Sequence, residues 1–442
     1  MGLSGLGIYK LLPKTNCRKC GFSTCLAFAM ALAKKQVDLE KCPTINPEVK
    51  DALEMASLPP IRLVTIGDGE NKVEVGKESV MFRHEEKFHY PTAIGFIIDD
   101  STADAQIQEK VKTISGLDFE RVGQQIKVNL IAVKQTGDSA NFVSKVKMIS
   151  EASNIPLVLM SSDVKVLKEV LEFCSKSRPL LYAADEKNIS EFIELAKSYS
   201  VPLAICANEL EKIEELAQKA SQAALEDVIL DTGSKSITKK INDLTIIRRL
   251  ALKKKKRSLG YPLLVVVDNE DPFHEAIEAG TYIAKYASIV LIKTVESWQT
   301  LALLTLRQNI YTDPQKPLQV EAKAYSIGQV TEQSPIMVTT NFSLTYYTVL
   351  GEVEASKVPS YILSVDTEGM SVLTAWAAEK FTPDKISDSL EKCGVKEKLK
   401  HNRLIIPGYV SVMSGDLEEK SGWQVVVGPK EASGLSSFLK KM

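Results

Sequence analysis

Eight short apolar runs, spaced regularly through the middle of the chain, constrain its fold more than any other feature. They are rich in β-branched residues and alternate with helical segments such as Asn188–Ser198 and Glu209–Ala223. Continuous apolar strands are typical of a parallel sheet covered on both faces, and eight strand–helix repeats are the number in a TIM barrel. We therefore predict a TIM barrel; a doubly wound open sheet is the alternative, but no Gly-rich dinucleotide fingerprint supports it. The runs begin at Ala93, Val128, Pro156, Pro179, Val201, Val228, Pro262 and Ser288.

The segments on either side of these runs have different patterns, so we expect an α/β multidomain chain. Its 442 residues exceed the length of one ordinary domain. We predict a small domain over residues 1–58, ending at a Leu58-Pro59-Pro60 linker. Residues 59–317 hold the barrel, preceded by a hairpin formed by Ile61–Ile66 and Lys72–Met81. Residues 318–442 alternate strands and helices again, which predicts a Rossmann-like α/β domain of ordinary size.

Four cysteines lie in the first of these domains. Cys17, Cys20, Cys25 and Cys42 have the spacing C-x2-C-x4-C-x16-C, with Gly21 in the tight front loop. Four thiolates are the ligand set of an iron–sulfur cluster. Structural zinc also takes four cysteines, but usually as two C-x2-C pairs, and only one pair is present. We predict an iron–sulfur cluster, with zinc as the alternative, and hence a place in a redox system.

The overall composition excludes several functional classes. The chain has 55 basic and 56 acidic residues, whereas a nucleic-acid or membrane-surface protein carries a basic excess. Cys174, Cys206 and Cys393 lie far apart in an odd set of seven, which argues against disulfides. The N-terminus has no signal-peptide pattern, and no apolar run reaches membrane-spanning length. We predict a soluble, cytoplasmic protein.

The barrel shows no convincing catalytic set in the sequence. Asp99, Asp100, Asp231, Asp268 and Asp271 fall at predicted strand ends, where the active sites of barrels lie. Acidic residues at such positions are also common helix caps. We therefore name no catalytic residue.

Two other groups have plain structural explanations. His84 and His89 could bind a metal, but no third ligand is evident, and a solvated strand edge is the simpler interpretation. The basic run Lys253–Arg257 follows a predicted helix, where cations suit the helix dipole. A docking patch for an acidic partner is the alternative for this run.

The C-terminal domain has the pattern of a ligand-binding sheet. Ligands bind such sheets at the carboxyl ends of the strands. Gly369, Gly408 and Gly428 follow predicted strands and would let a large flat ligand approach the backbone. Ordinary turn chemistry explains these glycines equally well.

The order of these domains, together with five sequence motifs, resembles a known family over essentially the whole chain. The cysteine motif by itself occurs in several electron-transport proteins, whereas the C-terminal motifs together are specific. The motifs are Asn16–Ala29 around the cysteines, Val338–Thr345, Ser364–Gly369, Leu404–Tyr409 and Val427–Ala432. They resemble the large (gamma) subunit of the corrinoid iron–sulfur protein, which belongs to the acetyl-CoA decarbonylase/synthase system of the reductive acetyl-CoA (Wood–Ljungdahl) pathway.

The resemblance implies two cofactors and the residues that hold them. The four cysteines would ligate a [4Fe-4S] cluster, and the C-terminal domain would hold a corrinoid (cobamide) through backbone and hydroxyl contacts. Arg18 and Met370 depart from what relatives often carry, without abolishing binding. The corrinoid-binding positions it implies are Thr340, Thr345, Tyr346, Gly369, Met370, Ser371, Val372, Leu373, Thr374, Gly408, Ala432 and Ser433.

One chemical detail comes from the residues themselves. Many cobalamin proteins ligate cobalt through the histidine of a D-x-H-x-x-G loop, which this chain lacks. The one histidine of the predicted C-terminal domain, His401, does not follow a predicted strand. The corrinoid is therefore expected to be base-off and without a histidine ligand, which makes Co(II) easier to reduce.

The activity implied by the resemblance is that of a methyl carrier. Co(I) would accept a methyl group from methyltetrahydrofolate, presented by a separate methyltransferase, and methyl-Co(III) would deliver it to the nickel site of acetyl-CoA synthase. The cluster, supplied by a low-potential electron donor, would return Co(II) to Co(I). The barrel would be scaffold and docking surface for a smaller subunit in a heterodimer, and Leu58-Pro59-Pro60 would be the hinge for the cluster domain.

Three other functions stay open from the sequence. A barrel methyltransferase that binds the pterin itself would depend on acids such as Asp99 and Asp231. A ferredoxin-like shuttle would contain the cluster but no cobalt. A related carrier could serve another methyl route, such as O-demethylation.

Overall fold

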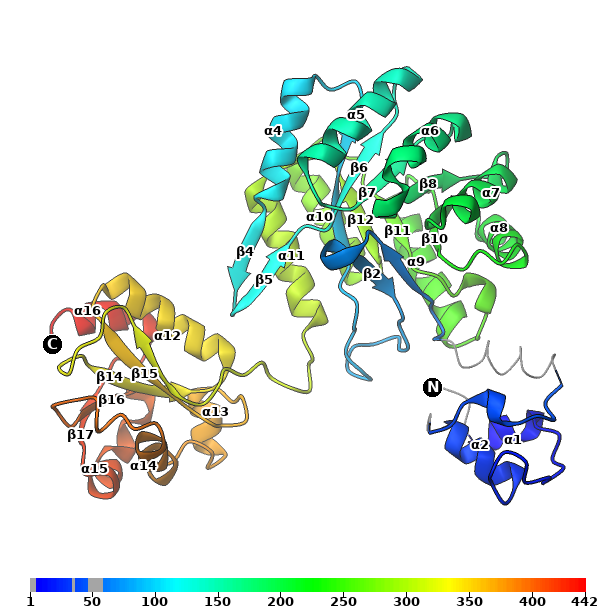
Figure 1. Ribbon diagram of the computed structural model, residues 1–442. Helices are drawn as coiled ribbons and strands as arrows, with labels where there is room; N and C mark the ends of the chain where they lie inside the picture. Colours follow the sequence, from blue (N-terminus) through cyan, green and yellow to red (C-terminus); the bar gives the residue numbers. More distant parts are fainter. Residues whose placement is uncertain (1–4, 34–35, 47–58) are drawn as a thin grey trace. The chain divides into compact units, whose positions relative to one another are not determined.

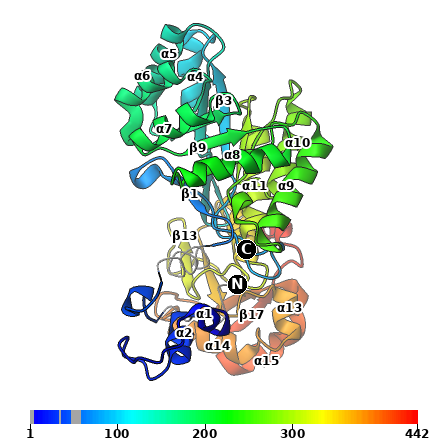
Figure 2. The same ribbon diagram turned by 90° about the vertical axis from the view of Figure 1, so that its right-hand side faces the viewer.

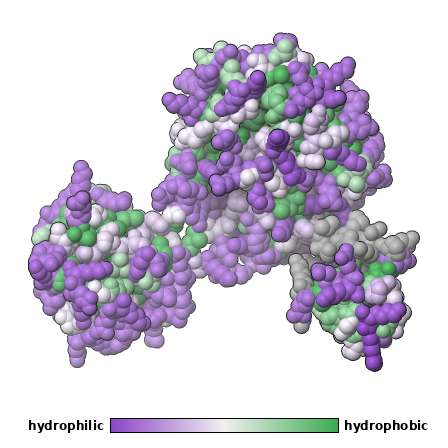
Figure 3. Space-filling view, in the orientation of Figure 1, coloured by the Kyte–Doolittle hydropathy of each residue, from purple (hydrophilic) through white to green (hydrophobic). Residues whose placement is uncertain are grey.

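The computed structural model describes residues 5–33, 36–46 and 59–442. It divides the chain into two compact units, Met1–Phe119 with Ile126–Tyr311, and Glu120–Gln125 with Thr312–Met442 (Figure 1). Among the described residues, no helix has both the length and the apolar character needed to cross a membrane. Hydrophilic residues cover most of the surface seen in Figure 3, with apolar residues between them. The predicted boundaries at 58/59 and 317/318 remain predictions.

The N-terminal segment folds as two short helices around a long loop. Helices α1 (Gly5–Leu11) and α2 (Cys25–Ala33) pack together, and the 3-10 turn η1 (Leu39–Lys41) precedes Cys42. Their small core consists of Ile8, Leu12, Cys25, Phe28 and Ala29. Because this core is so small, the metal group predicted beside it would contribute directly to folding.

Eight parallel strands form the sheet of the first unit, and each coincides with one of the eight predicted runs. The sheet order is β10-β9-β8-β7-β6-β3-β12-β11. A parallel bridge between Leu230 and Leu263 joins its two edge strands, so the barrel is nearly closed. The barrel prediction is confirmed. The strands are β3 (Ala93–Asp99), β6 (Leu130–Lys134), β7 (Leu157–Met160), β8 (Leu180–Ala184), β9 (Leu203–Cys206), β10 (Val228–Asp231), β11 (Leu264–Val266) and β12 (Ile289–Ile292).

The barrel strands are buried on both faces because side chains alternate between two cores. Ile97, Ala132 and Val158 point into the barrel, while their neighbours Ile98 and Val133 pack outward against helices. Figures 1 and 2 show these helices around the outside of the strands. They are α4 (Asp104–Ser115), α5 (Ser139–Ala152), α6 (Val164–Cys174), α7 (Ile189–Tyr199), α8 (Leu210–Gln222), α9 (Ile237–Leu252), α10 (Pro272–Ala284) and α11 (Ser297–Tyr311).

Two hairpins accompany the barrel, and only the first was expected. Strands β1 (Leu63–Ile66) and β2 (Val73–Gly76) pair antiparallel, as predicted, and their apolar side chains join the core inside the barrel. Strands β4 (Asp118–Arg121) and β5 (Gln124–Lys127) form a second hairpin. Its turn places Val122 and Gly123 at φ 54° and 67°, the left-handed pair that a two-residue hairpin turn requires.

The predicted linker is partly anchored to the barrel. Leu58 lies outside the described residues. The carbonyl of Pro59 accepts a hydrogen bond of 2.8 Å from Nη1 of Arg257. Pro59 is therefore tied to the barrel, and the predicted hinge at Leu58-Pro59-Pro60 stays a prediction.

The second unit contains a five-stranded sheet in the order β13-β15-β14-β16-β17. Strand β13 is antiparallel to β15, and the other pairs are parallel. Helix α13 (Val372–Ala377) follows a turn that extends to Met370, and Ser371 is its N-cap. The strands are β13 (Ala324–Ile327), β14 (Ile336–Thr340), β15 (Ser360–Val365), β16 (Arg403–Ile406) and β17 (Gln424–Val427), and the helices are α12 (Ser343–Ser356), α13 (Val372–Ala377), α14 (Pro383–Lys392), η5 (Gly408–Met413), α15 (Ser414–Ser421), η6 (Ala432–Gly434) and α16 (Leu435–Leu439).

Candidate functional site

The cysteine loop is closed by hydrogen bonds to residues beside its cysteines. Oδ1 of Asn16 accepts a hydrogen bond of 2.8 Å from the amide of Cys25, whose Sγ in turn accepts from the amide of Asn16 at 3.3 Å. The hydroxyl of Thr44 lies 3.6 Å from Sγ of Cys42 and also hydrogen-bonds the thiol of Cys17. Contacts made by Asn16 and Thr44 thus connect the neighbourhoods of Cys17, Cys25 and Cys42.

The thiols lie in and beside the small apolar core of the N-terminal segment. Cys25 belongs to the small apolar core, and Cys20 and Cys42 pack against it. Hydrogen bonds, first from the backbone of Lys19, lower the pKa of Cys17 and so favour the thiolate that binds metal. Among the described residues, no three His, Cys, Asp or Glu side chains converge where one metal ion could be held.

The predicted acids of the barrel lie at the carboxyl ends of strands, and most of them have partners. Oδ1 of Asp100 accepts from the amide and hydroxyl of Thr136 at 2.8 and 2.5 Å. Asp268 forms an ion pair with Lys293. Asp271 is the N-cap of α10, so the helix-cap interpretation is confirmed for it.

Asp231 is the most deeply placed of these acids. Its two oxygens accept hydrogen bonds from the hydroxyl of Tyr182 at 2.7 Å and from the amide of Gly233 at 2.8 Å. Burial raises the pKa of Asp231, and burial beside Asp231 raises the pKa of the Cys206 thiol to about 12. Both oxygens of Asp231 therefore already have hydrogen-bond partners within the barrel.

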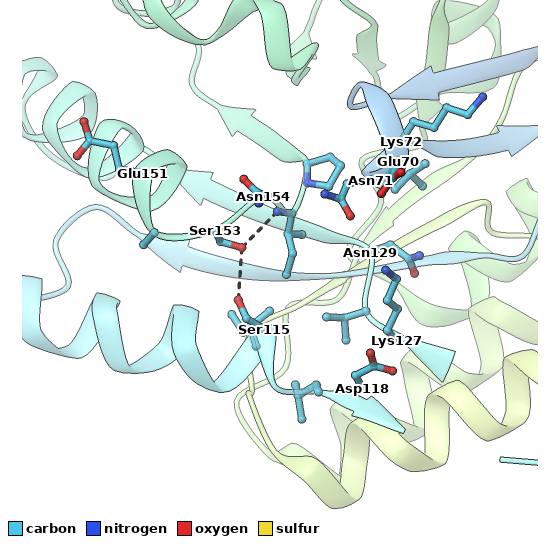
Figure 4. A pocket seen from close by; sticks show the side chains of 17 residues that line it. Glu70, Asn71, Lys72, Ser115, Asp118, Lys127, Asn129, Glu151, Ser153 and Asn154 are labelled. Carbon is cyan, nitrogen blue, oxygen red and sulfur yellow. Dashed lines mark hydrogen bonds between the residues drawn. The ribbon is translucent and has the colours of Figure 1, made fainter. Parts of the chain in front are cut away.

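A cavity of about 450 Å³ lies at the opposite end of the barrel strands (Figure 4). It is lined by residues just before β6 and β7, such as Asn129 and Pro156, and by Lys72, Lys127 and Asp118. Ser153 closes one side, with its Oγ 3.3 Å from Oγ of Ser115. Barrel active sites lie at the carboxyl ends of strands, so the position of this cavity argues against a catalytic role.

The remaining polar groups singled out in the sequence have local partners. His89 Nε2 lies 2.9 Å from Glu86, and the ring of His84 stacks on Phe82. In the basic run, Lys256 pairs with Glu214 at 2.5 Å. These residues have structural explanations within the first unit, as expected.

The carboxyl edge of the second sheet contains buried hydroxyl groups that have no partner. Thr339 and Thr340 end strand β14, and Ser364 lies opposite Thr339 on β15. All three are at most 2% exposed, and none of their side-chain oxygens makes a hydrogen bond. Since buried polar groups are normally paired, these hydroxyls identify an edge that is suited to a polar ligand.

A small cavity of about 130 Å³ opens at the same edge. It is lined by Met337–Thr339 of β14 and by Ile405–Pro407 at the end of β16. The strand order reverses at this point. Strand β15 lies on one side of β14, and β16, the next strand along the chain, lies on the other side of β14. Such a switch point is where open α/β sheets bind ligands.

Three of the sequence-predicted corrinoid positions, Thr345, Val372 and Ala432, line this cavity together. Leu373 and Thr374 are exposed on α13, and the hydroxyl of Ser371 lies 3.0 Å from that of Thr374. Tyr346 instead packs against Tyr325 inside the unit. Thr339, Ser364 and the cavity residue Tyr409 were not predicted, because nothing in a sequence tells an unpaired hydroxyl from a paired one.

A single side chain, Asn341, holds the turn on which several predicted positions lie. Its Oδ1 accepts hydrogen bonds of 3.0 Å from the amides of Thr367 and Gly369 and from the Thr367 hydroxyl. Its Nδ2 donates to Gln319 and Asp366 at 3.1 Å. Asn341 is thus a positioning residue, and its place directly after a strand is the only sequence signal for it.

The glycines at this edge serve the packing of the chain. A Cβ on Gly408 would lie 2.6 Å from the carbonyl oxygen of Gly428, and one on Gly369 would meet Gln319 while the residue holds φ +74°. Ordinary turn chemistry therefore accounts for these two glycines without a ligand.

His401 lies away from this edge. Its Nε2 is 3.0 Å from the carbonyl of Ser334, and its Nδ1 accepts from the amide of Arg403, the first residue of β16. It is thus placed at the amino end of the strand, as the sequence suggested.

Comparison with known proteins assigns the chain to a family. The family model described as CO dehydrogenase/acetyl-CoA synthase delta subunit matches residues 63–439, and an Fe-S cluster model matches residues 12–44. The corrinoid/iron-sulfur protein large subunit of Moorella thermoacetica is 45% identical over 100% of this chain and 99% of its own. The chain belongs to this family of large subunits. The acetyl-CoA decarbonylase/synthase complex subunit gamma of Methanothermobacter thermautotrophicus is 35% identical, with 100% and 99% covered.

Among solved structures, dihydropteroate synthases match about half of the chain. The enzyme from Thermus thermophilus gives a TM-score of 0.38 at 13% identity, covering 50% of this chain and 95% of its own. That from Yersinia pestis gives 0.38 at 12% identity, covering 50% and 93%.

Proposed function

We propose that the chain is the methyl-carrying subunit of an acetyl-CoA synthase system. The observation that carries the proposal is the set of unpaired buried hydroxyls at the carboxyl edge of the second sheet, Thr339 and Ser364 toward one face and Thr340 toward the other, in a chain of this family. A corrinoid presents many amide groups around its ring, and such hydroxyls can hydrogen-bond them. The bound corrinoid would supply the cobalt that takes up and releases the methyl group, and the protein would supply position and electronics.

The chain's own residues have distinct roles in this proposal. Thr340 and the Ser371–Thr374 segment would bind the corrinoid side chains, and Asn341 would hold the turn that presents them. The apolar walls Val372 and Ile405 of the cavity would exclude water from the part of the ligand that enters it. Each role follows from a hydroxyl, a turn or an apolar wall at one edge of the sheet.

We further propose that no protein nitrogen binds the cobalt in this unit. Among the described residues of the second unit, His401 is the only histidine, and both of its ring nitrogens have partners at the amino end of β16. Without such a donor, the metal is easier to reduce. This base-off arrangement suits reduction by a low-potential cluster.

The cysteine loop is proposed to hold a [4Fe-4S] cluster through Cys17, Cys20, Cys25 and Cys42. The contacts through Asn16 and Thr44 and the shared core support this assignment. The proposed partners are a smaller subunit, a methyltetrahydrofolate methyltransferase, acetyl-CoA synthase and a low-potential electron donor, in the cytoplasm.

The test is metal analysis and an anaerobic visible spectrum of the full chain, expressed with its smaller subunit and reconstituted with cobamide. We expect about one cobalt and four irons per chain. Cys42→Ser should lower the iron content and retain cobalt. Thr340→Arg, whose side chain would fill the sheet edge, should lower the cobalt content and retain iron. Cys393→Ser, outside both sites, is the control and should change neither.

Iron without cobalt after this reconstitution would favour the cobalt-free electron carrier and overturn the proposal. Zinc in place of iron would overturn the cluster assignment. A related carrier in O-demethylation would be recognised by accepting methyl groups from a methoxylated aromatic system and not from methyltetrahydrofolate.

A further inference from the structure

The hydroxyl of Thr44 contacts two sulfur atoms of the cysteine loop. Thr44 follows Cys42 by two residues, and its Oγ1 lies 3.6 Å from Sγ of Cys42. The same hydroxyl is hydrogen-bonded to the thiol of Cys17, which comes from the other end of the loop. Within the described part of the chain, both polar contacts of this side chain are therefore made to sulfur.

A second threonine hydroxyl reaches Cys17 from the other side. Thr15 also hydrogen-bonds the thiol of Cys17, as does the backbone of Lys19. A hydroxyl has one proton to donate, so the two threonines together can donate one hydrogen bond to Cys17 and one to Cys42. A cysteine that has lost its proton to bind a metal can only accept, and this makes Thr15 and Thr44 the donors.

A purely structural role is the alternative for a threonine in a loop, and Thr24 of the same loop is an example. The Oγ1 of Thr24 accepts a hydrogen bond of 3.0 Å from the amide of Ala27, in the first turn of α2, as a helix cap does. Among the described residues, the hydroxyl of Thr44 has no such backbone partner. The contacts of Thr44 therefore indicate an effect on the sulfur atoms rather than on the path of the loop.

We propose that Thr15 and Thr44 raise the reduction potential of the cluster by donating hydrogen bonds to Cys17 and Cys42. This inference rests on the proposed function, which assigns a [4Fe-4S] cluster to the four cysteines. Hydrogen bonds to the ligand sulfurs are among the factors that set the potential of a cluster. They stabilise the reduced form more than the oxidised form, because reduction adds negative charge and hydrogen bonds to charged acceptors are stronger.

The two threonines are positioning residues, because they act through the ligand sulfurs. A higher potential makes the cluster easier for a low-potential donor to reduce, and it leaves the reduced cluster a weaker reductant for Co(II). The side chains at positions 15 and 44 thus divide the available driving force between the electron transfer into the cluster and the transfer out of it.

The test is a redox titration of the full chain with its smaller subunit, followed by electron paramagnetic resonance of the reduced cluster. Thr44→Val keeps almost the same shape and removes the donor. At a fixed solution potential it should lower the ratio of reduced to oxidised cluster by about threefold, within the range of one net hydrogen bond. A threefold change is about 28 mV for a one-electron couple.

Two further variants show whether the hydroxyl itself is responsible. Thr15→Val should lower the potential in the same direction, and the double variant Thr15→Val/Thr44→Val should lower it further. Thr44→Ser keeps a hydroxyl and should restore the native potential.

The matched control is Thr24→Val. It also removes an exposed threonine hydroxyl beside a cysteine of the loop, but this hydroxyl bonds an amide and not sulfur. Thr24→Val should speed the hydrogen exchange of the α2 amides, because a helix cap is lost, and should leave the potential unchanged.

Two results would overturn the inference. Thr44→Val and Thr15→Val could both keep the native potential with full iron content, which would show that water replaces the lost donors. Thr44→Ser could lower the potential as far as Thr44→Val, which would assign the shift to packing and not to the hydroxyl. If Thr44→Val fails to retain iron, Thr44→Ala and Thr15→Val decide the question by the same measurement.

Iron content separates this inference from the proposed function. A native chain that holds zinc or no metal in its cysteine loop would end the cluster assignment. A native chain with about four irons, whose potential does not respond to either hydroxyl, would end this inference alone. The titration needs no cobamide, so its result does not depend on the corrinoid assignment.

Discussion

Replacing Thr340 by valine should stabilise the cobamide-free protein and weaken cobamide binding, two effects of opposite direction. Thr340 is fully buried and its Oγ1 has no hydrogen-bond partner. A buried unpaired polar group costs about 1–3 kcal/mol, and valine has almost the same shape without this cost. Taking the lower limit, Thr340→Val should stabilise β14 by about 1 kcal/mol, which is about fivefold slower exchange of its amides.

Cobamide binding should respond in the other direction. If Thr340 donates to a corrinoid amide, its loss removes a hydrogen bond of about 1 kcal/mol and leaves a ligand group unpaired, so the affinity should fall by about tenfold. The assays are hydrogen exchange of peptides covering β14 in the cobamide-free chain, and titration with cobamide followed by visible absorption.

The matched control is Thr367→Val in the same unit. Thr367 is equally buried, but its hydroxyl bonds Asn341 and the carbonyl of Met370. At this position the same substitution should lower stability by about 1 kcal/mol and therefore speed amide hydrogen exchange. If Thr340→Val speeds exchange as well, its hydroxyl is paired in solution; if cobamide binds unchanged, Thr340 does not contact the ligand. Either result refutes the reasoning.

Three further predictions concern the rest of the fold. Arg248→Met should lower stability by about 3–5 kcal/mol, because the substitution leaves the buried carboxylate of Glu78, 3.1 Å from Arg248, without its partner. In a thermal melt, the double variant Arg248→Met/Glu78→Gln should recover most of the lost stability. Gly408→Ala should cost about 1–3 kcal/mol, because the new Cβ meets backbone of Gly428, whereas Gly415→Ala, with no atom within 4 Å, should show no such loss. Burial raises the pKa of Cys206 to about 12, so alkylation of Cys206 at pH 9 should be several hundredfold slower than that of an ordinary thiol. Because the thiol loses its proton at lower pH in the unfolded chain than in the folded chain, the free energy of unfolding should fall as pH rises above about 9. Fast alkylation of Cys206 in the folded chain would contradict this prediction.

The barrel was predictable because each strand is continuously apolar and follows a helical segment of fixed rhythm. The second hairpin was not, since Asp118–Lys127 is mostly polar and its pairing depends on the left-handed turn at Val122 and Gly123. The short edge strand β13 gave no signal for a similar reason, because Ala324–Ile327 has no buried residue.

The candidate sites differ in the same way. The cysteine set is visible in the sequence because its chemistry lies in residue type and spacing. The sheet edge is visible in the sequence only in part. Thr340 and Thr345 were predicted from the resemblance, whereas the position of Thr339 opposite Ser364 depends on strand register.

Buried polar atoms without a hydrogen-bond partner occur at the carboxyl edges of both sheets, on Asp99 and Asp100 of the barrel and on Thr339, Thr340 and Ser364 of the second unit. A ligand gains most from groups whose hydrogen bonds are not already made within the protein. In the barrel, both oxygens of Asp231 have partners and Asp268 pairs with Lys293, so a ligand at these two acids would first have to break existing contacts. At the end of β14 the hydroxyls of Thr339 and Thr340 are buried and unpaired, so a ligand that binds them would break no existing hydrogen bond. The two edges thus differ in the kind of unpaired group they hold: carboxylate oxygens in the barrel, which only accept hydrogen bonds, and hydroxyls in the second unit, which can also donate to a ligand.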